Sequence, residues 1–187
     1  ATDQEVLGSN PSRRTKKGKY ESIFTKICYI FFPNNSYNFN NFINISMIKK
    51  FKQISTKPGF LKNNGGLLFR KISNNKYEFK TIISKIHLNR AQNTHGGYIC
   101  SIIDAGAGTA AHSSAKGKSC VTISLEIKFI APTKINDEII GTVLINKKTN
   151  SLVFLNCILK SKKKTIATSS GIWKILNNKI LGAGFGG

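Results

Sequence analysis

The stretch "NRAQNTHGGYICSIIDAGAGTAAHSS", residues 89–114, decides the fold of this chain. Over residues 97–113 its apolar and small side chains recur every three or four positions, a spacing that predicts a helix. A His-Gly-Gly motif, residues 95–97, stands directly before this helix, and one acid, Asp104, lies near its middle. A carboxylate on a face that otherwise has the composition of a core is costly to bury. Asp104 is therefore a candidate functional residue.

The segments on either side of this helix alternate apolar and polar residues, which predicts strands. Two such runs precede the helix, at 66–72 and 77–89, with the turn sequence SNNK between them. Four follow it after a Lys/Gly turn, at 119–132, 137–148, 151–161 and 164–176. One long helix among antiparallel strands predicts an α+β architecture, in which a curved antiparallel sheet wraps around one central helix.

The 187 residues divide into four parts of different composition. We expect residues 1–46 to form a basic, Asn-rich extension that is disordered or serves in targeting, since no carboxylate occurs from position 22 to position 77. Residues 47–62 begin at the only methionine and predict a short basic helix or linker. The folded domain is expected at 63–176, and a flexible tail at 177–187.

The formal net charge of +21 raises nucleic acid or an anionic membrane surface as a partner. The charge is dispersed, however, because residues 1–80 carry +11 and residues 81–187 carry +10. This distribution favours exposed lysines scattered over the surface, and we expect no nucleic-acid groove. No apolar run reaches the roughly 18 residues of a membrane-spanning helix, so no transmembrane segment is expected.

The four cysteines, Cys28, Cys100, Cys120 and Cys157, are widely spaced and form no CxxC or Cys/His cluster. Such spacing is typical of reduced thiols and offers no zinc site, so no metal is expected. Reduced thiols together with a basic N-terminal region favour a mitochondrial or cytoplasmic location.

Three features occur together at fixed spacings: Asn89 before the His-Gly-Gly motif, Asp104 nine residues after His95, and the segment "VTISLEIKFIAPTK" at 121–134. In this combination the chain, over roughly residues 63–176, resembles the hotdog-fold thioesterases of the phenylacetate-degradation (PaaI-like) group. The resemblance implies an acyl-CoA thioester hydrolase that acts on medium- or long-chain fatty acyl-CoA. It also implies a homodimer or homotetramer that needs no cofactor.

Physical chemistry supports that reaction at these positions. The first turn of a helix has unpaired N–H groups and the positive end of the helix dipole, so the Gly96 N–H is a natural donor to an oxyanion. Asp104 is expected either to activate water as a general base or to attack as a nucleophile. The resemblance implies that Asn89 holds the same carbonyl and that Thr122 orients the water. His95 is expected either to cap the helix or to take part directly.

Four further residues are candidates for substrate binding. Gly97 and Tyr98 follow the oxyanion donor, and the Tyr98 ring is expected to line the acyl tunnel or to shorten the chain that it accepts. Lys116 and Lys118 are candidate phosphate contacts, as are the lysines at 162–164, although each of these positions is more typical of a solvated surface lysine.

The spacing along the helix has a consequence for assembly. Asp104 follows Gly96 by eight residues, which places it about 12 Å further along the helix axis and roughly 80° around it. One subunit cannot readily direct both groups at one carbonyl. We therefore expect composite sites at a two-fold interface, with Asn89, His95 and Gly96 from one subunit and Asp104 and Thr122 from the other.

Two other classes of function stay open. A hydratase or dehydratase on the same fold would carry an Asp/His or Glu/His pair, and the sequence offers none. A catalytically silent acyl-CoA-binding protein, or a basic protein that binds nucleic acid or membrane, is the stronger alternative. It is favoured by the unusual N-terminal region and by Gln92, at a position where the resembling proteins commonly have glycine.

Overall fold

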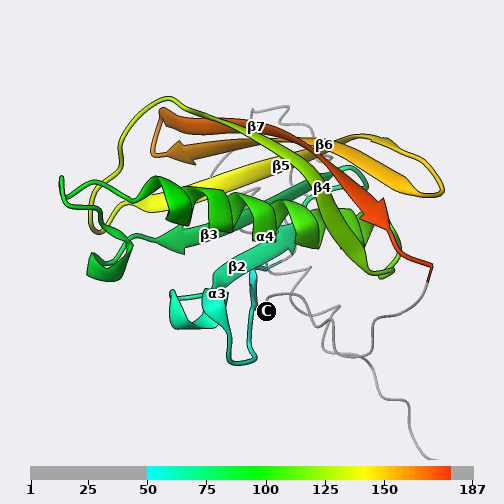
Figure 1. The fold of residues 1–187 in the computed structure, drawn as a ribbon, viewed down its shortest axis with the longest axis horizontal. Coiled ribbons are helices and arrows are strands. Elements are labelled where there is room, and N and C mark those ends of the chain that lie inside the picture. Colours follow the sequence, from blue (N-terminus) through cyan, green and yellow to red (C-terminus); the bar gives the residue numbers. More distant parts are fainter. Residues whose placement is uncertain (1–49, 178–187) are drawn as a thin grey trace, which may run out of the picture. The chain divides into compact units, whose positions relative to one another are not determined.

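One long helix lies across a seven-stranded antiparallel sheet (Figure 1). The computed structural model describes residues 50–177, within the unit Ile48–Gly187. The predicted N-terminal extension, and all but the first residue of the predicted C-terminal tail, lie outside the described residues. The α+β hotdog architecture expected from the sequence is confirmed.

The elements follow the predicted order after two short ones. These two are β1 (Lys52–Ile54) and α3 (Phe60–Asn63). The others are β2 (Leu67–Lys71), β3 (Lys76–Ile82), the 3-10 helix η1 (Lys85–His87), α4 (Gly96–Ser114), β4 (Cys120–Phe129), β5 (Glu138–Lys148), β6 (Leu152–Ser161) and β7 (Lys164–Ile175). The strand order in the sheet is β1-β2-β3-β5-β6-β7-β4, so β4 closes one edge although it follows the helix directly.

Two predicted boundaries are wrong. Within 47–62 the structure has the strand β1 and, at its end, the start of the four-residue helix α3, where the sequence predicted one basic helix or linker. Pairing of β1 with β2 overrides the weak local preference for a helix. The strand predicted at 77–89 stops at Ile82, because a 3-10 turn begins after Ser84. The backbone N–H of Ser84 donates to His87 Nδ1 at 3.0 Å, which closes that turn.

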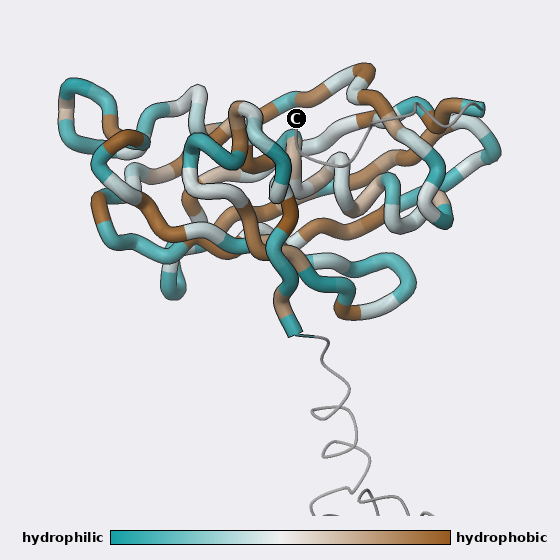
Figure 2. Tube along the Cα trace, turned by 90° about the horizontal axis from the view of Figure 1, so that it is seen from below, coloured by the Kyte–Doolittle hydropathy of each residue, from teal (hydrophilic) through white to brown (hydrophobic). Residues whose placement is uncertain are grey.

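The core lies between α4 and the concave face of the sheet. The buried face of α4 is formed by apolar and small residues three or four positions apart, namely Tyr98, Ile99, Ile102, Ile103, Gly106, Ala107, Ala110 and Ala111. Hydrophobic and hydrophilic residues alternate along the strands, and the connecting loops at both ends are mainly hydrophilic (Figure 2). The helix and the alternating strands thus bury one face each and share a single hydrophobic core.

A close approach in this core explains the small residues of the helix. The Phe79 ring lies between Gly106 of α4 and Gly141 of β5, the residue with which Phe79 is in register. A Cβ atom on either glycine would overlap the ring. The glycines therefore set the distance between helix and sheet.

The edge strand β4 differs from the inner strands because both of its faces carry exposed residues. Its exposed apolar side chains include Ile123 and Phe129, with Ile130 directly after the strand, and these are 56–59% exposed. A bulge at Ile123 interrupts the pairing of β4 with β7 between Thr122 and Ser124. An exposed apolar strand with free N–H and C=O groups is suited to pairing with another chain.

Candidate active site

The N-terminal tip of α4 presents one free donor. His95 is the N-cap, and its Nδ1 accepts the Gly97 N–H at 2.9 Å. The Tyr98 N–H donates to the His95 carbonyl oxygen at 3.0 Å. Among residues 50–177, no hydrogen-bond acceptor lies within reach of the Gly96 N–H. Of the two roles expected for His95, the structure shows the capping role, and the Gly96 N–H is left without a partner among the described residues at the positive end of the helix dipole.

The loop before α4 is shaped by Asn89. Its side-chain oxygen accepts the backbone N–H groups of Ala91 at 2.9 Å and Asn93 at 3.2 Å. The loop also contains Gln92 with a φ of 59°, the left-handed region that favours glycine. A left-handed φ is a position where glycine has a conformational advantage, and in this chain glutamine takes that conformation. The predicted contact between Asn89 and the substrate carbonyl stays a prediction.

A pair of threonines anchors this loop to the segment after β4. The Thr94 N–H donates to the Thr133 carbonyl oxygen at 2.8 Å, and the Thr133 hydroxyl donates to the Thr94 hydroxyl at 2.7 Å. The next residue, His95, donates its N–H to the His87 carbonyl oxygen at 2.7 Å. His95, the residue before Gly96, is therefore fixed by its own bond to His87 and by the bonds of its neighbour Thr94 to Thr133. These bonds limit the reorganisation needed when a ligand binds at the helix tip.

Asp104 and Thr122, which were expected to act from the same chain, are in direct contact. The Thr122 hydroxyl donates to Asp104 Oδ1 at 2.7 Å. The bulge that follows Thr122 interrupts the regular pairing of β4 beside this contact. One carboxylate oxygen is thus oriented by the threonine, and the second oxygen is left to accept a proton from water.

Asp104 and Asp137 are the two acids among residues 50–177 that belong to no ion pair. The three ion pairs in this part of the chain join Glu78 to Arg70, Glu138 to Lys80 and Glu126 to Lys128. Asp137 accepts the backbone N–H of Lys134 at 2.9 Å, whereas the only bond to the Asp104 carboxylate among the described residues comes from the Thr122 hydroxyl. Within these residues, the Asp104 carboxylate is therefore available for chemistry.

The environment of Asp104 differs from the expectation in one respect. The sequence predicted a buried acid, whereas in the single chain Asp104 is exposed, because it lies on the side of α4 turned away from the sheet. Its carboxylate therefore has no desolvation cost until another molecule covers it. Asp104 is the eighth residue after Gly96 in the helix, so about 12 Å along the axis still separates the two groups.

Tyr98 does not take the predicted position in an acyl tunnel. It is 6% exposed, its ring stacks on His87 with centroids 3.7 Å apart, and its hydroxyl lies 3.2 Å from Thr81 Oγ1. Burial raises the pKa of Tyr98 and lowers the pKa of His87, so both side chains stay neutral near pH 7. This placement makes Tyr98 part of the core beneath the helix tip.

The remaining predicted contacts are divided between the two ends of α4. Gly97 is exposed at the N-terminal tip beside the His95 ring. Lys116 and Lys118 are exposed just past the C-terminal end of the helix, roughly 28 Å away along the axis of a 19-residue helix. Within one chain the structure therefore does not bring these lysines to the Gly96 N–H.

Sequence analysis missed the Thr94–Thr133 pair. Thr94 directly precedes His95, and Thr133 lies near the end of the segment at 121–134 that carries the family resemblance. The two residues are 39 positions apart, and no local period connects them. Only the path of the chain over the sheet brings them together.

The described part of the chain contains no cluster of three or more His, Cys, Asp or Glu side chains placed to hold a metal ion. Within residues 50–177, no helix is long and apolar enough to cross a membrane.

Comparisons with known proteins agree with this geometry. The thioesterase superfamily matches residues 91–168, which include α4, β4 and β5. Mouse acyl-coenzyme A thioesterase 13 is 28% identical over 80 residues, which are 43% of this chain. That match spans 57% of the relative's own length.

Two solved structures share the fold. Zebra fish thioesterase superfamily member 2 superposes with a TM-score of 0.60 at 21% identity, over 76% of this chain and all of the other. The E. coli PaaI protein superposes with a TM-score of 0.58 at 19% identity, over 63% of this chain and 84% of the other. Residues 91–168 are therefore similar to the thioesterase superfamily, and the chain shares the hotdog fold with these solved structures.

Proposed function

We propose that the protein hydrolyses acyl-CoA thioesters to a free fatty acid and CoA, with medium- or long-chain acyl groups as substrates. The observation that carries this proposal is the pair of groups on α4: a Gly96 N–H without a partner among the described residues, and an Asp104 carboxylate held only by Thr122. The name of the mouse relative, an acyl-coenzyme A thioesterase, supports the choice of substrate.

The reaction follows from what each group can do. The Gly96 N–H donates to the thioester oxygen as negative charge develops on it. Asp104 takes a proton from water, the water oxygen bonds to the carbonyl carbon, and the bond from carbon to sulfur breaks. A CoA thiolate leaves and is protonated to the thiol. Thr122 keeps the carboxylate oriented for the proton transfer through its bond of 2.7 Å to Oδ1.

The edge strand explains how two chains complete one site. Thr122, near one end of β4, contacts Asp104, while Phe129 at the other end lies beside Gly96, where an added Cβ would be 3.6 Å from its ring. If two β4 strands pair antiparallel about a two-fold axis midway between these residues, Thr122 of each chain lies opposite Phe129 of the other. The acid of one chain then faces the helix tip of its mate, and the exposed apolar residues of β4 are covered.

Mixing two inactive variants tests this assembly. One variant lacks the Asp104 carboxylate, and the other lacks the Gly96 N–H. Each variant alone forms homodimers in which neither site is complete, so each alone should be inactive. After both are denatured together and refolded in equal amounts, half of the dimers are mixed and each has one intact site, so about a quarter of the wild-type activity should return. A mixture as inactive as its components would show that both groups act within one chain.

The reaction itself is tested by thiol release. The full chain should liberate CoA thiol from acyl-CoA, measured with a thiol reagent across a series of acyl chain lengths, with the highest kcat/KM for medium or long chains. Binding of acyl-CoA without thiol release at any chain length would favour the catalytically silent alternative.

A further inference from the structure

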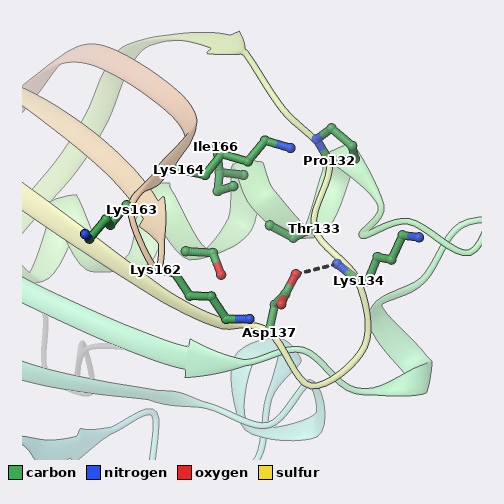
Figure 3. A pocket seen from close by; sticks show the side chains of 9 residues that line it. Pro132, Thr133, Lys134, Asp137, Lys162, Lys163, Lys164 and Ile166 are labelled. Carbon is green, nitrogen blue, oxygen red and sulfur yellow. Dashed lines mark hydrogen bonds between the residues drawn. The ribbon is translucent and has the colours of Figure 1, made fainter.

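A basic pocket lies beside the helix tip and has no role in the chemistry described above. It has a volume of about 420 Å³ and is formed by the segment from Pro132 to Asp137 on one side and the turn between β6 and β7 on the other (Figure 3). Four of the residues that line it are lysines: Lys134, Lys162, Lys163 and Lys164. One carboxylate, Asp137, also lines it and is engaged with the backbone N–H of Lys134.

The lysines of this pocket are not neutralised within the described residues, because none of them belongs to the three ion pairs of that part of the chain. Lys162 and Lys164 extend from the β6–β7 turn toward the opposite wall, whereas Lys163 is directed away from it (Figure 3). Lys162 has a φ of 53°, so the turn keeps a lysine in a conformation that favours glycine. Two lysines directed into the pocket, against one carboxylate that a backbone N–H already engages, make the pocket suited to a negatively charged ligand.

The wall of the pocket is connected to the carbonyl-binding site. Thr133 lines the pocket and bonds to Thr94, two residues before Gly96. Ile166, which also lines the pocket, accepts the backbone N–H groups of Ile130 and Ala131, which follow Phe129 beside Gly96. The helix tip and the wall of the pocket thus belong to one hydrogen-bonded region.

We propose that this pocket binds the phosphate groups of the CoA thioester, with Lys162 and Lys164 as the contacts that contribute most. The inference rests on the proposed function, because the CoA ester is the ligand whose carbonyl is held at Gly96. The phosphates and the thioester of CoA are joined by the flexible pantetheine arm, which separates a charged end from the reacting end. Lysine contributes point charges to phosphate binding.

The test compares two double variants of the full chain that lose the same charge. Lys162→Asn with Lys164→Gln removes the pocket contacts, and asparagine tolerates the left-handed turn. Lys147→Gln with Lys160→Gln is the control, since both lysines are exposed on β5 and β6 and neither lines the pocket. Equal melting temperatures establish that both variants are folded. Calorimetry with adenosine 3′,5′-bisphosphate, the nucleotide end of CoA, should show affinity about 10- to 100-fold weaker for the pocket variant, and little change for the control.

The kinetics separate this proposal from the proposed function. The pocket variant should raise KM for acyl-CoA by a similar factor with kcat retained. It should hydrolyse an acyl-N-acetylcysteamine thioester, which has no phosphate, at the wild-type rate.

Equal bisphosphate affinity in the two double variants, or no binding by the wild type, would overturn the pocket assignment, even if thioesters are hydrolysed. Inorganic phosphate that binds as tightly as the bisphosphate would also overturn it, by showing a site for phosphate alone. Bisphosphate binding that follows the prediction, in a protein that releases no thiol, would leave the pocket in place and reject the hydrolase.

Discussion

Replacement of Asp104 by asparagine is expected to lower kcat for acyl-CoA hydrolysis by about 10²- to 10⁴-fold, the contribution typical of a positioned acid–base group. Asparagine preserves the shape of the side chain, and its carbonyl oxygen can still accept the Thr122 hydroxyl now bonded to Oδ1 at 2.7 Å. Because Asp104 is exposed in the single chain, loss of its charge leaves no unpaired buried group. The melting temperature and KM should therefore change little, while thiol release falls.

The matched control for this variant is Glu138→Gln. Glu138 is an exposed acid on β5, which two strands separate from the edge strand β4, and it receives the same chemical change. Its partner is Lys80 at 2.6 Å. We expect close to the wild-type rate. Unchanged thiol release in Asp104→Asn, or equal losses in the two variants, would remove Asp104 from the chemistry.

Replacement of Gly96 by proline is expected to lower kcat by about 10²- to 10³-fold, the effect of removing one oxyanion donor. Proline has no N–H, and the Gly96 N–H is the donor without a partner at the tip of α4 among the described residues. The helix should persist, because proline is favoured at the first helical position. The preceding residue, His95, already has φ −62° and ψ 133°, an extended conformation compatible with a following proline.

Gly96→Ala is the control for the added side chain. Its Cβ would lie 3.6 Å from the Phe129 ring, an ordinary van der Waals contact, and its N–H is retained. Comparison of kcat for the two variants, with circular dichroism to show that both keep the helix, separates loss of the donor from added bulk. Equal rates in alanine and proline variants would contradict a role for the N–H group.

The long elements of the fold were predictable because their signals are local. The 3–4 spacing of apolar and small residues placed α4 within one residue of its observed ends, 96 and 114. The period of two located β4 to β7 within three residues at each end. The short elements were not predictable, since β1 forms only by pairing with β2, and β3 ends where Ser84 and His87 close a turn.

Part of the candidate site was predictable because its signals are also local. The capping role of His95 and the free donor at Gly96 follow from their position at the start of a helix. The family resemblance implied that Thr122 orients the water and that it acts from the same chain as Asp104, but it did not predict the direct contact between these two side chains. The geometry of this contact required the strand after the helix to return along the edge of the sheet beside α4.

The sequence by itself determined the helix, the four strands after it, the free N–H at the helix tip and the spacing that separates this N–H from the acid. The tertiary structure alone decided that Asp104 is exposed, that its carboxylate contacts Thr122, that Thr94 bonds to Thr133, and that lysines of the β6–β7 turn face the loop after β4. The physical reason is the distance along the sequence over which each interaction acts. Periodicity and capping act between residues a few positions apart, whereas these contacts join residues much further apart, such as Thr94 and Thr133, and depend on how the helix packs and on the order of the strands.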